Sequence, residues 1–140
     1  MSRRGLVIGL HWTAGFALLA MVKGGSAAPE LRWAFVGLVT VWLAVMAAGG
    51  PLGRPGPKLT GLLRAIFLPF HLALYAALAV AAALNALALT GRASDATAWT
   101  ALLVLFFLAL IHAVFHLWRH TALRDNALRK IIPRRMHKHL

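Results

Sequence analysis

Four long stretches of the chain contain no Asp, Glu, Lys or Arg: residues 5–22, 33–53, 65–91 and 96–118. Each stretch has at least 18 residues, enough for a helix to cross the roughly 30 Å hydrocarbon layer of a membrane. Their apolar residues do not alternate with polar ones, as the strands of a membrane barrel require. The pattern therefore predicts an all-α membrane protein with four transmembrane helices.

The connections between these stretches are short, and we expect a single membrane-embedded domain over residues 1–140. The expected helices cover residues 5–22, 32–50, 62–90 and 96–120, and a basic tail follows over residues 121–140. Short connections favour antiparallel neighbours, so the helices are expected to form an up-down-up-down bundle. The first stretch is as long as a spanning helix, and we expect it to be retained rather than cleaved as a signal peptide.

Composition and charge exclude the main soluble classes. Apolar residues make up 61% of the 140 residues and charged residues only 13%, which a water-soluble enzyme of this size could not bury. The net charge of +12 would suit a nucleic-acid-binding protein, but its placement fits a membrane better. Three basic residues lie at the first and third connections, on one side of the predicted bundle: Lys23, Arg32 and Arg92. The other twelve lie at the termini, the middle connection and the adjoining helix ends: Arg3, Arg4, Arg54, Lys58, Arg64, Arg119, Arg124, Arg129, Lys130, Arg134, Arg135 and Lys138.

This asymmetry predicts that both termini face the cytoplasm, in a bacterial inner membrane, because positive loops stay on the cytoplasmic side. The basic tail is also suited to anionic lipid. The predicted partners are therefore the lipid bilayer and not nucleic acid.

Histidines carry the candidate chemistry. His11, His71 and His112 each lie seven residues from a basic residue at the cytoplasmic edge. At 1.5 Å per residue, all three are expected roughly 10 Å inside that edge, on three different helices. His116 follows one helical turn nearer the cytoplasm on the face of His112.

A polar side chain at this depth needs a partner, and the sequence places no acid inside a predicted helix to provide one. Hydrogen bonds between helices are one solution. The other is a metal, because neutral imidazole is a good ligand for iron and two imidazoles on facing helices can hold a haem. The chain has no Cys, so such a haem would be non-covalent, of the b type. Arg64, Arg119 and Arg124 could bind its propionates or anchor the helix ends in the membrane.

Three segments resemble the bacterial cytochrome b561 family and, more distantly, the membrane cytochrome b subunits of formate dehydrogenases and hydrogenases. The segments are Leu10-His11-Trp12, His71 with Tyr75 four residues later, and Arg124-Asp125-Asn126-Ala127-Leu128-Arg129 after the fourth helix. The resemblance implies a four-helix haem protein that exchanges electrons with quinone. It also implies that His11 and His112 are the axial ligands of a haem on the cytoplasmic side.

The resemblance further implies a second, outer haem, but Trp33 and Ala98 stand where its ligands are expected. We therefore expect one haem b. His71 could line a quinone pocket, contact a propionate or replace a ligand, and His116 could contact quinone or a propionate.

The expected function is membrane electron transfer, as a carrier or as a component of a quinone-linked oxidoreductase. The protein could work within a larger respiratory or photosynthetic complex or as a homodimer. The alternative is a haem-free structural subunit of such a complex, which the missing outer ligands would fit.

Overall fold

The computed structural model describes residues 2–51 and 53–132, which form helices and connections without any strand. Four long helices follow one another: α1 (Arg3–Val22), α2 (Pro29–Gly49), α3 (Gly61–Leu89) and α4 (Asp95–Thr121). Two short 3-10 helices, η1 (Gly25–Ala27) and η2 (Ala127–Lys130), follow α1 and α4. The predicted all-α class and the four predicted helices are confirmed. The part of the predicted tail after residue 132 lies outside the described residues.

All four helices are long and apolar enough to cross a membrane. Large apolar side chains also face outward on each of them: Phe16 is 65% exposed, Val41 52%, Leu62 74% and Phe107 61%. Apolar surface on this scale is unfavourable in water and matches a hydrocarbon surrounding. These features indicate a multi-pass membrane protein in a lipid bilayer.

The helix ends follow from local sequence. The hydroxyl of Ser2 accepts a hydrogen bond from the amide of Gly5 at the start of α1, and Ser94 accepts one from Thr97 at the start of α4. Each hydroxyl satisfies an amide that has no partner in the first helical turn. Pro29 opens α2, where its missing amide costs nothing. Gly91 has a φ of 70°, a left-handed conformation that favours glycine and lets the chain turn from α3 into α4.

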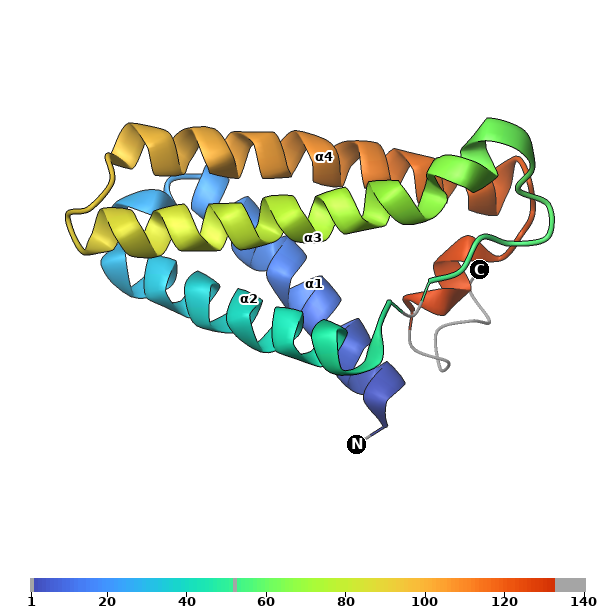
Figure 1. Cartoon of the computed structure of the whole chain (residues 1–140), viewed down its shortest axis with the longest axis horizontal. Coiled ribbons are helices and arrows are strands. Elements are labelled where there is room, and N and C mark those ends of the chain that lie inside the picture. The colour runs from blue at the N-terminus through green and yellow to red at the C-terminus, as the bar shows by residue number, and fades with distance from the viewer. Residues whose placement is uncertain (1, 52, 133–140) are drawn as a thin grey trace.

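The helices pack as a ring in which α1 contacts α2, α2 contacts α3, α3 contacts α4, and α4 contacts α1. Figure 1 shows the α1–α2 and α3–α4 connections at one end, and the N-terminus and the α2–α3 connection at the other. The tightest core lies toward the first of these ends: Leu18, Met21, Phe35, Val39, Leu78, Ala81, Ala82, Leu102 and Leu105. Polar side chains gather on either side of this core, in two separate groups.

Candidate functional site

Histidine side chains from α1, α3 and α4 meet in the half of the bundle near the N-terminus. Between ring centres, His112 lies 6.2 Å from His11, 5.0 Å from His71 and 4.5 Å from His116. His116 is buried and the other three are partly buried. The structure thus brings together all four histidines that the sequence singles out, with His112 at their centre.

Two of these histidines are hydrogen-bonded to each other. Nε2 of His71 lies 3.2 Å from Nε2 of His116, and Nδ1 of His71 lies 2.6 Å from the carbonyl oxygen of Phe67. A carbonyl oxygen only accepts, so Nδ1 of His71 carries the proton in the neutral ring. Nε2 of His71 then accepts, and Nε2 of His116 donates to it. The backbone of α3 therefore fixes the orientation of the His71 ring.

Other ring nitrogens in the cluster have no partner within residues 2–51 and 53–132, the described part of the chain. The Nδ1 atoms of His11, His112 and His116 are buried without a hydrogen bond, as is Nε1 of Trp42 beside His11. A buried polar atom without a partner carries a free-energy penalty of about 1–3 kcal/mol. The cluster therefore holds more hydrogen-bonding capacity than the side chains around it satisfy.

Three of the histidines are close enough to share one metal ion. One nitrogen from each of His71, His112 and His116 can be chosen so that all three lie within 4.8 Å of one another. Two imidazoles on a tetrahedral metal, with bonds of about 2.0–2.1 Å, place their nitrogens roughly 3.3 Å apart. The observed limit of 4.8 Å is wider than that spacing, so the three rings would have to move closer together to bind one ion.

The side chains around the cluster are mainly aromatic, and Asp125, which lies near His116, is paired with Arg119. The Phe67 ring lies 4.2 Å from His71, and the Phe70 ring lies 6.2 Å from His112. Glu30 and Asp95 lie in the first turns of α2 and α4, at the far end of the bundle. Neutral imidazoles in an apolar cage suit a soft or borderline metal, or a macrocycle, better than a hard cation such as calcium.

Arg119, expected as a propionate partner, already has a carboxylate partner. Its side chain is fully buried and forms an ion pair with Asp125, whose side chain is 1% exposed. Nε of Arg119 donates to Oδ2 of Asp125 at 2.7 Å, and the guanidinium lies 5.0 Å above the Phe67 ring. Phe67 thus lies near both the Arg119 guanidinium and the His71 ring, and the ion pair lies beside the histidine cluster.

The other two candidate arginines bind elsewhere or are exposed. Nη1 of Arg64 donates to the carbonyl oxygens of Gly56 and Leu59, at 3.2 and 3.4 Å. Arg124 is exposed, with a φ of 49°, and its carbonyl oxygen accepts a hydrogen bond from Lys58 at 3.2 Å. Neither side chain reaches the histidine cluster among the described contacts.

Basic and aromatic side chains fasten the segment after α4 across this end of the bundle. Nη2 of Arg4 donates to the carbonyl oxygen of Arg129 at 2.9 Å, and Nε1 of Trp12 donates to that of Ile131 at 2.9 Å. Nζ of Lys130 donates to the carbonyl oxygen of Arg54 at 3.1 Å. Burial and the nearby Arg119 lower the pKa of Lys130. The segment therefore covers the end of the bundle under which the histidines lie.

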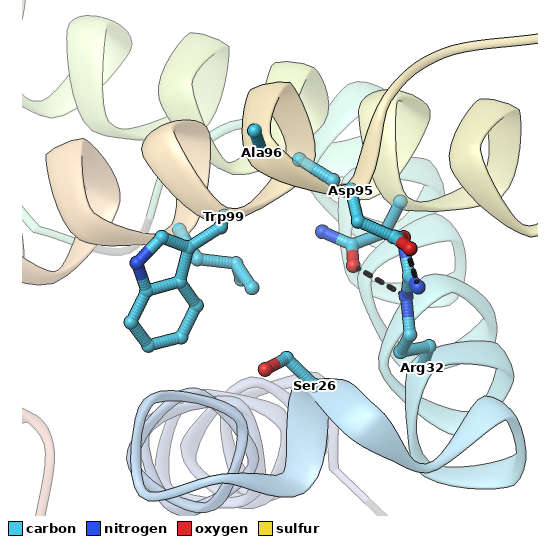
Figure 2. Close-up of a pocket in the computed structure, with 8 residues that line it drawn as sticks. Ser26, Arg32, Asp95, Ala96 and Trp99 are labelled. Atoms are coloured by element: carbon cyan, nitrogen blue, oxygen red, sulfur yellow. Dashed lines mark hydrogen bonds and ion pairs between the residues drawn. The ribbon is translucent and has the colours of Figure 1, made fainter.

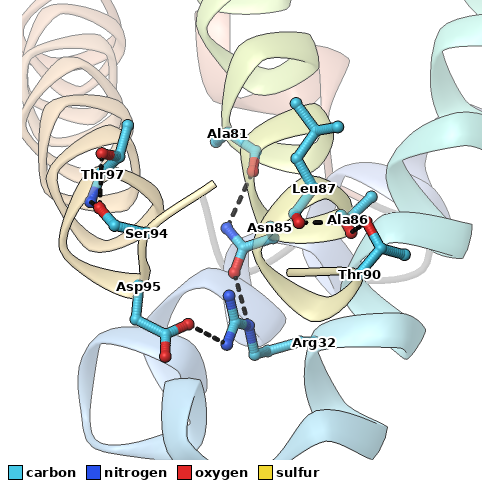
Figure 3. A network of polar contacts seen from close by, with 9 residues as sticks. All are labelled: Arg32, Ala81, Asn85, Ala86, Leu87, Thr90, Ser94, Asp95 and Thr97. Carbon is cyan, nitrogen blue, oxygen red and sulfur yellow. Dashed lines mark hydrogen bonds and ion pairs between the residues drawn. The ribbon is translucent and has the colours of Figure 1, made fainter. Parts of the chain in front are cut away.

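A second polar group, which the sequence did not single out as a site, lies at the opposite end. Figure 2 shows Arg32, Asp95 and Ser26 around a pocket there, and Figure 3 shows how Arg32 is held. Nε of Arg32 donates to Oδ1 of Asn85 at 3.0 Å, and Nη1 donates to Oδ1 of Asp95 at 2.7 Å. An Asn deep in an apolar stretch is the one sequence signal that could have pointed to this group.

Comparisons with known proteins identified no relatives of this chain. No protein-family model, curated protein or solved structure matches the chain.

The two ion pairs are expected to differ sharply in their effect on stability. Asp125→Ala leaves Arg119 buried without a counter-charge and should lower the free energy of unfolding by about 3–5 kcal/mol. Asp95→Ala removes a carboxylate that is 82% exposed and should cost within about 1 kcal/mol. Unfolding of the detergent-solubilised protein by heat or denaturant measures both.

The double variant Arg119→Leu/Asp125→Ala provides the control for this comparison. It removes the charge along with its partner and should recover much of the lost stability. Equal losses for Asp125→Ala and Asp95→Ala would contradict the assignment of Arg119–Asp125 as the structural pair.

Proposed function

We propose that this protein is a membrane b-type cytochrome that holds one haem between His11 and His112 and exchanges electrons with quinone. The observation that carries the proposal is the convergence of histidines from α1, α3 and α4 in one largely apolar layer, where three of their rings lie 4.5 to 6.2 Å from that of His112. The resemblance of three segments to the cytochrome b561 family supports the same assignment.

The spacing of the two proposed ligands fits one iron. Two imidazoles on opposite sides of a metal, with metal–nitrogen bonds of about 2 Å, place their ring centres roughly 6 Å apart. The His11 and His112 rings lie 6.2 Å apart, inclined by 46°. Each also has a buried Nδ1 atom with no protein partner, as expected where the cluster is built around a further group.

A haem with two axial histidines supplies one-electron transfer and has no open position for oxygen. This chain's own residues would orient it and exclude water. His71 and His116, already hydrogen-bonded to each other, would line its edge. Arg64 and Arg124 remain candidates for the propionates, whereas Arg119 is engaged by Asp125.

The proposed topology is up-down-up-down with both termini in the cytoplasm of a bacterial inner membrane. The support is the distribution of twelve basic residues on one side against three on the other. The haem would then lie near the cytoplasmic face, so its electron exchange would be with quinone in that part of the membrane, alone or within a larger redox complex or homodimer.

A second candidate is a non-haem metal centre at His71, His112 and His116. The specific observation in its favour is that their ligand nitrogens lie within 4.8 Å of one another. Because His112 belongs to both candidate sites, one centre excludes the other.

The topology predicts which new cysteines react from outside the cell. The chain has no Cys, so single cysteines can be introduced without background labelling. In intact cells stripped of the outer membrane, Arg92→Cys should react with a membrane-impermeant maleimide, and Thr60→Cys should react only after lysis. The reverse pattern would invert the topology.

The haem assignment predicts which histidine variants lose pigment. The purified protein should show b-type bands in a reduced-minus-oxidised spectrum, with about one haem per chain by pyridine haemochrome assay. His11→Ala and His112→Ala should each lose the haem, because each removes an axial ligand. His71→Ala should retain it, and His120→Ala is the matched control on α4.

The same variants separate the alternatives. A pigment-free His71→Ala beside a pigmented His11→Ala would overturn the ligand assignment. A colourless wild-type protein that binds about one Zn²⁺ or Co²⁺, and loses it in His71→Ala and His116→Ala, would establish the non-haem centre instead. A protein with neither haem nor metal would support the structural subunit.

A further inference from the structure

The end of the bundle opposite the histidines contains a pocket of about 270 Å³. Its walls come from η1 and from three of the long helices: Ser26 of η1, Arg32 of α2, Asn85 of α3, and Asp95, Trp99 and Leu102 of α4. Figure 2 shows Ser26 and Trp99 facing each other across it, with Arg32 at one side. A concave, mostly apolar site with a few converging polar groups is the usual form of a ligand pocket.

Arg32 is the cation of this pocket, and it is far more buried than the carboxylate with which it is paired. Its side chain is 9% exposed, whereas the side chain of its partner Asp95 is 82% exposed. The positive charge is therefore held in the wall of the pocket, while the carboxylate lies at the rim toward solvent. An exposed carboxylate contributes little to such a pair and can turn into water at low cost.

Asn85 holds the guanidinium in place. Its Oδ1 accepts from Nε of Arg32 at 3.0 Å, and its Nδ2 donates to the carbonyl oxygen of Ala81 at 2.8 Å, so both ends of the amide are fixed (Figure 3). A guanidinium has five N–H donors, of which two are engaged by Asn85 and Asp95. The other three donors have no partner among the described residues and are left for a ligand in the pocket.

Ser26 supplies a further donor. Its hydroxyl is directed into the pocket, and it makes no hydrogen bond with any described residue (Figure 2). The remaining walls, formed by Ala98, Trp99 and Leu102, are apolar and continue into the core of the bundle. The pocket thus combines a charged, donor-rich side with an apolar side.

We propose that this pocket binds a phosphate-class oxyanion, presented either by the head group of an anionic phospholipid or as free phosphate. The anion would accept hydrogen bonds from the free N–H groups of Arg32 and from the hydroxyl of Ser26. Arginine suits phosphate because its planar fork can donate two parallel hydrogen bonds. The apolar wall favours the lipid source, since an acyl chain could lie against Trp99 and Leu102. The ligand displaces Asp95 from Arg32, so Asp95 is its competitor.

Because the ligand and Asp95 compete for Arg32, substitutions of these two residues should change ligand binding in opposite directions. Retention of phosphatidylglycerol and of phosphatidylcholine is compared by native mass spectrometry of the detergent-solubilised protein, and inorganic phosphate is titrated calorimetrically. Arg32→Gln should weaken binding about tenfold or more, as expected for loss of a charged hydrogen-bond donor. Asp95→Asn should strengthen binding several-fold, because it removes the competing charge and keeps the shape of the side chain. Arg32→Lys keeps the charge without the fork and should bind with intermediate strength.

Arg92→Gln is the matched control, because Arg92 is exposed near the same end and does not line the pocket. It should bind like the wild-type protein. Selective retention of phosphatidylglycerol with this ranking of variants supports a lipid head group, and the same ranking with inorganic phosphate alone supports the free ion. Weaker binding by Asp95→Asn, or no dependence on Arg32, would overturn the proposal, and so would equal retention of the two lipids together with no binding of inorganic phosphate. The histidine cluster is not altered in any of these variants, so the result is independent of the haem assignment.

Discussion

The structure depends on one constraint: hydrocarbon offers no hydrogen-bond partners, so each polar side chain inside the bundle must find its partner within the protein. Arg119 meets this requirement with Asp125, and Arg32 meets it with Asn85 and Asp95. The histidines meet it only in part. His71 and His116 bond to each other, yet buried nitrogens of the cluster remain unpaired. This incomplete satisfaction is the physical reason to expect a bound group there.

The two buried arginines, Arg119 and Arg32, are paired with carboxylates that differ in their exposure to solvent. The carboxylate of Asp125 is as buried as Arg119, so the pair can neither separate nor exchange without exposing a charge to a low-dielectric interior. The carboxylate of Asp95 is 82% exposed, so Arg32 can change its partner while Asp95 returns to water. One pair therefore fastens the segment after α4 to the bundle, and the other leaves a cation available to a pocket.

Much of this architecture follows from sequence patterns, and the limits of the prediction are physical. Charge-free runs predict the four helices because length and hydropathy alone decide whether a helix can span a membrane. Equal spacing from the basic residues predicts a common depth for His11, His71 and His112, because helical rise is constant. The pairing of Arg119 with Asp125 was not predicted, since it requires positive φ values at Arg124 and Asn126. Contact between Arg32 and Asn85 depends on helix rotation, which spacing does not specify.

The Arg119–Asp125 pair also bears on the charge that the histidine layer can accept. The iron of the proposed haem would gain positive charge on oxidation, and nearby uncompensated cations would oppose that gain in an apolar interior. Arg119 lies against Phe67, the residue whose ring contacts His71, so its charge acts at close range. Because Asp125 compensates that charge locally, the ion pair beside the cluster has no net charge. This neutral ion pair lowers the electrostatic cost of an oxidisable centre among the histidines, which themselves provide no negative charge.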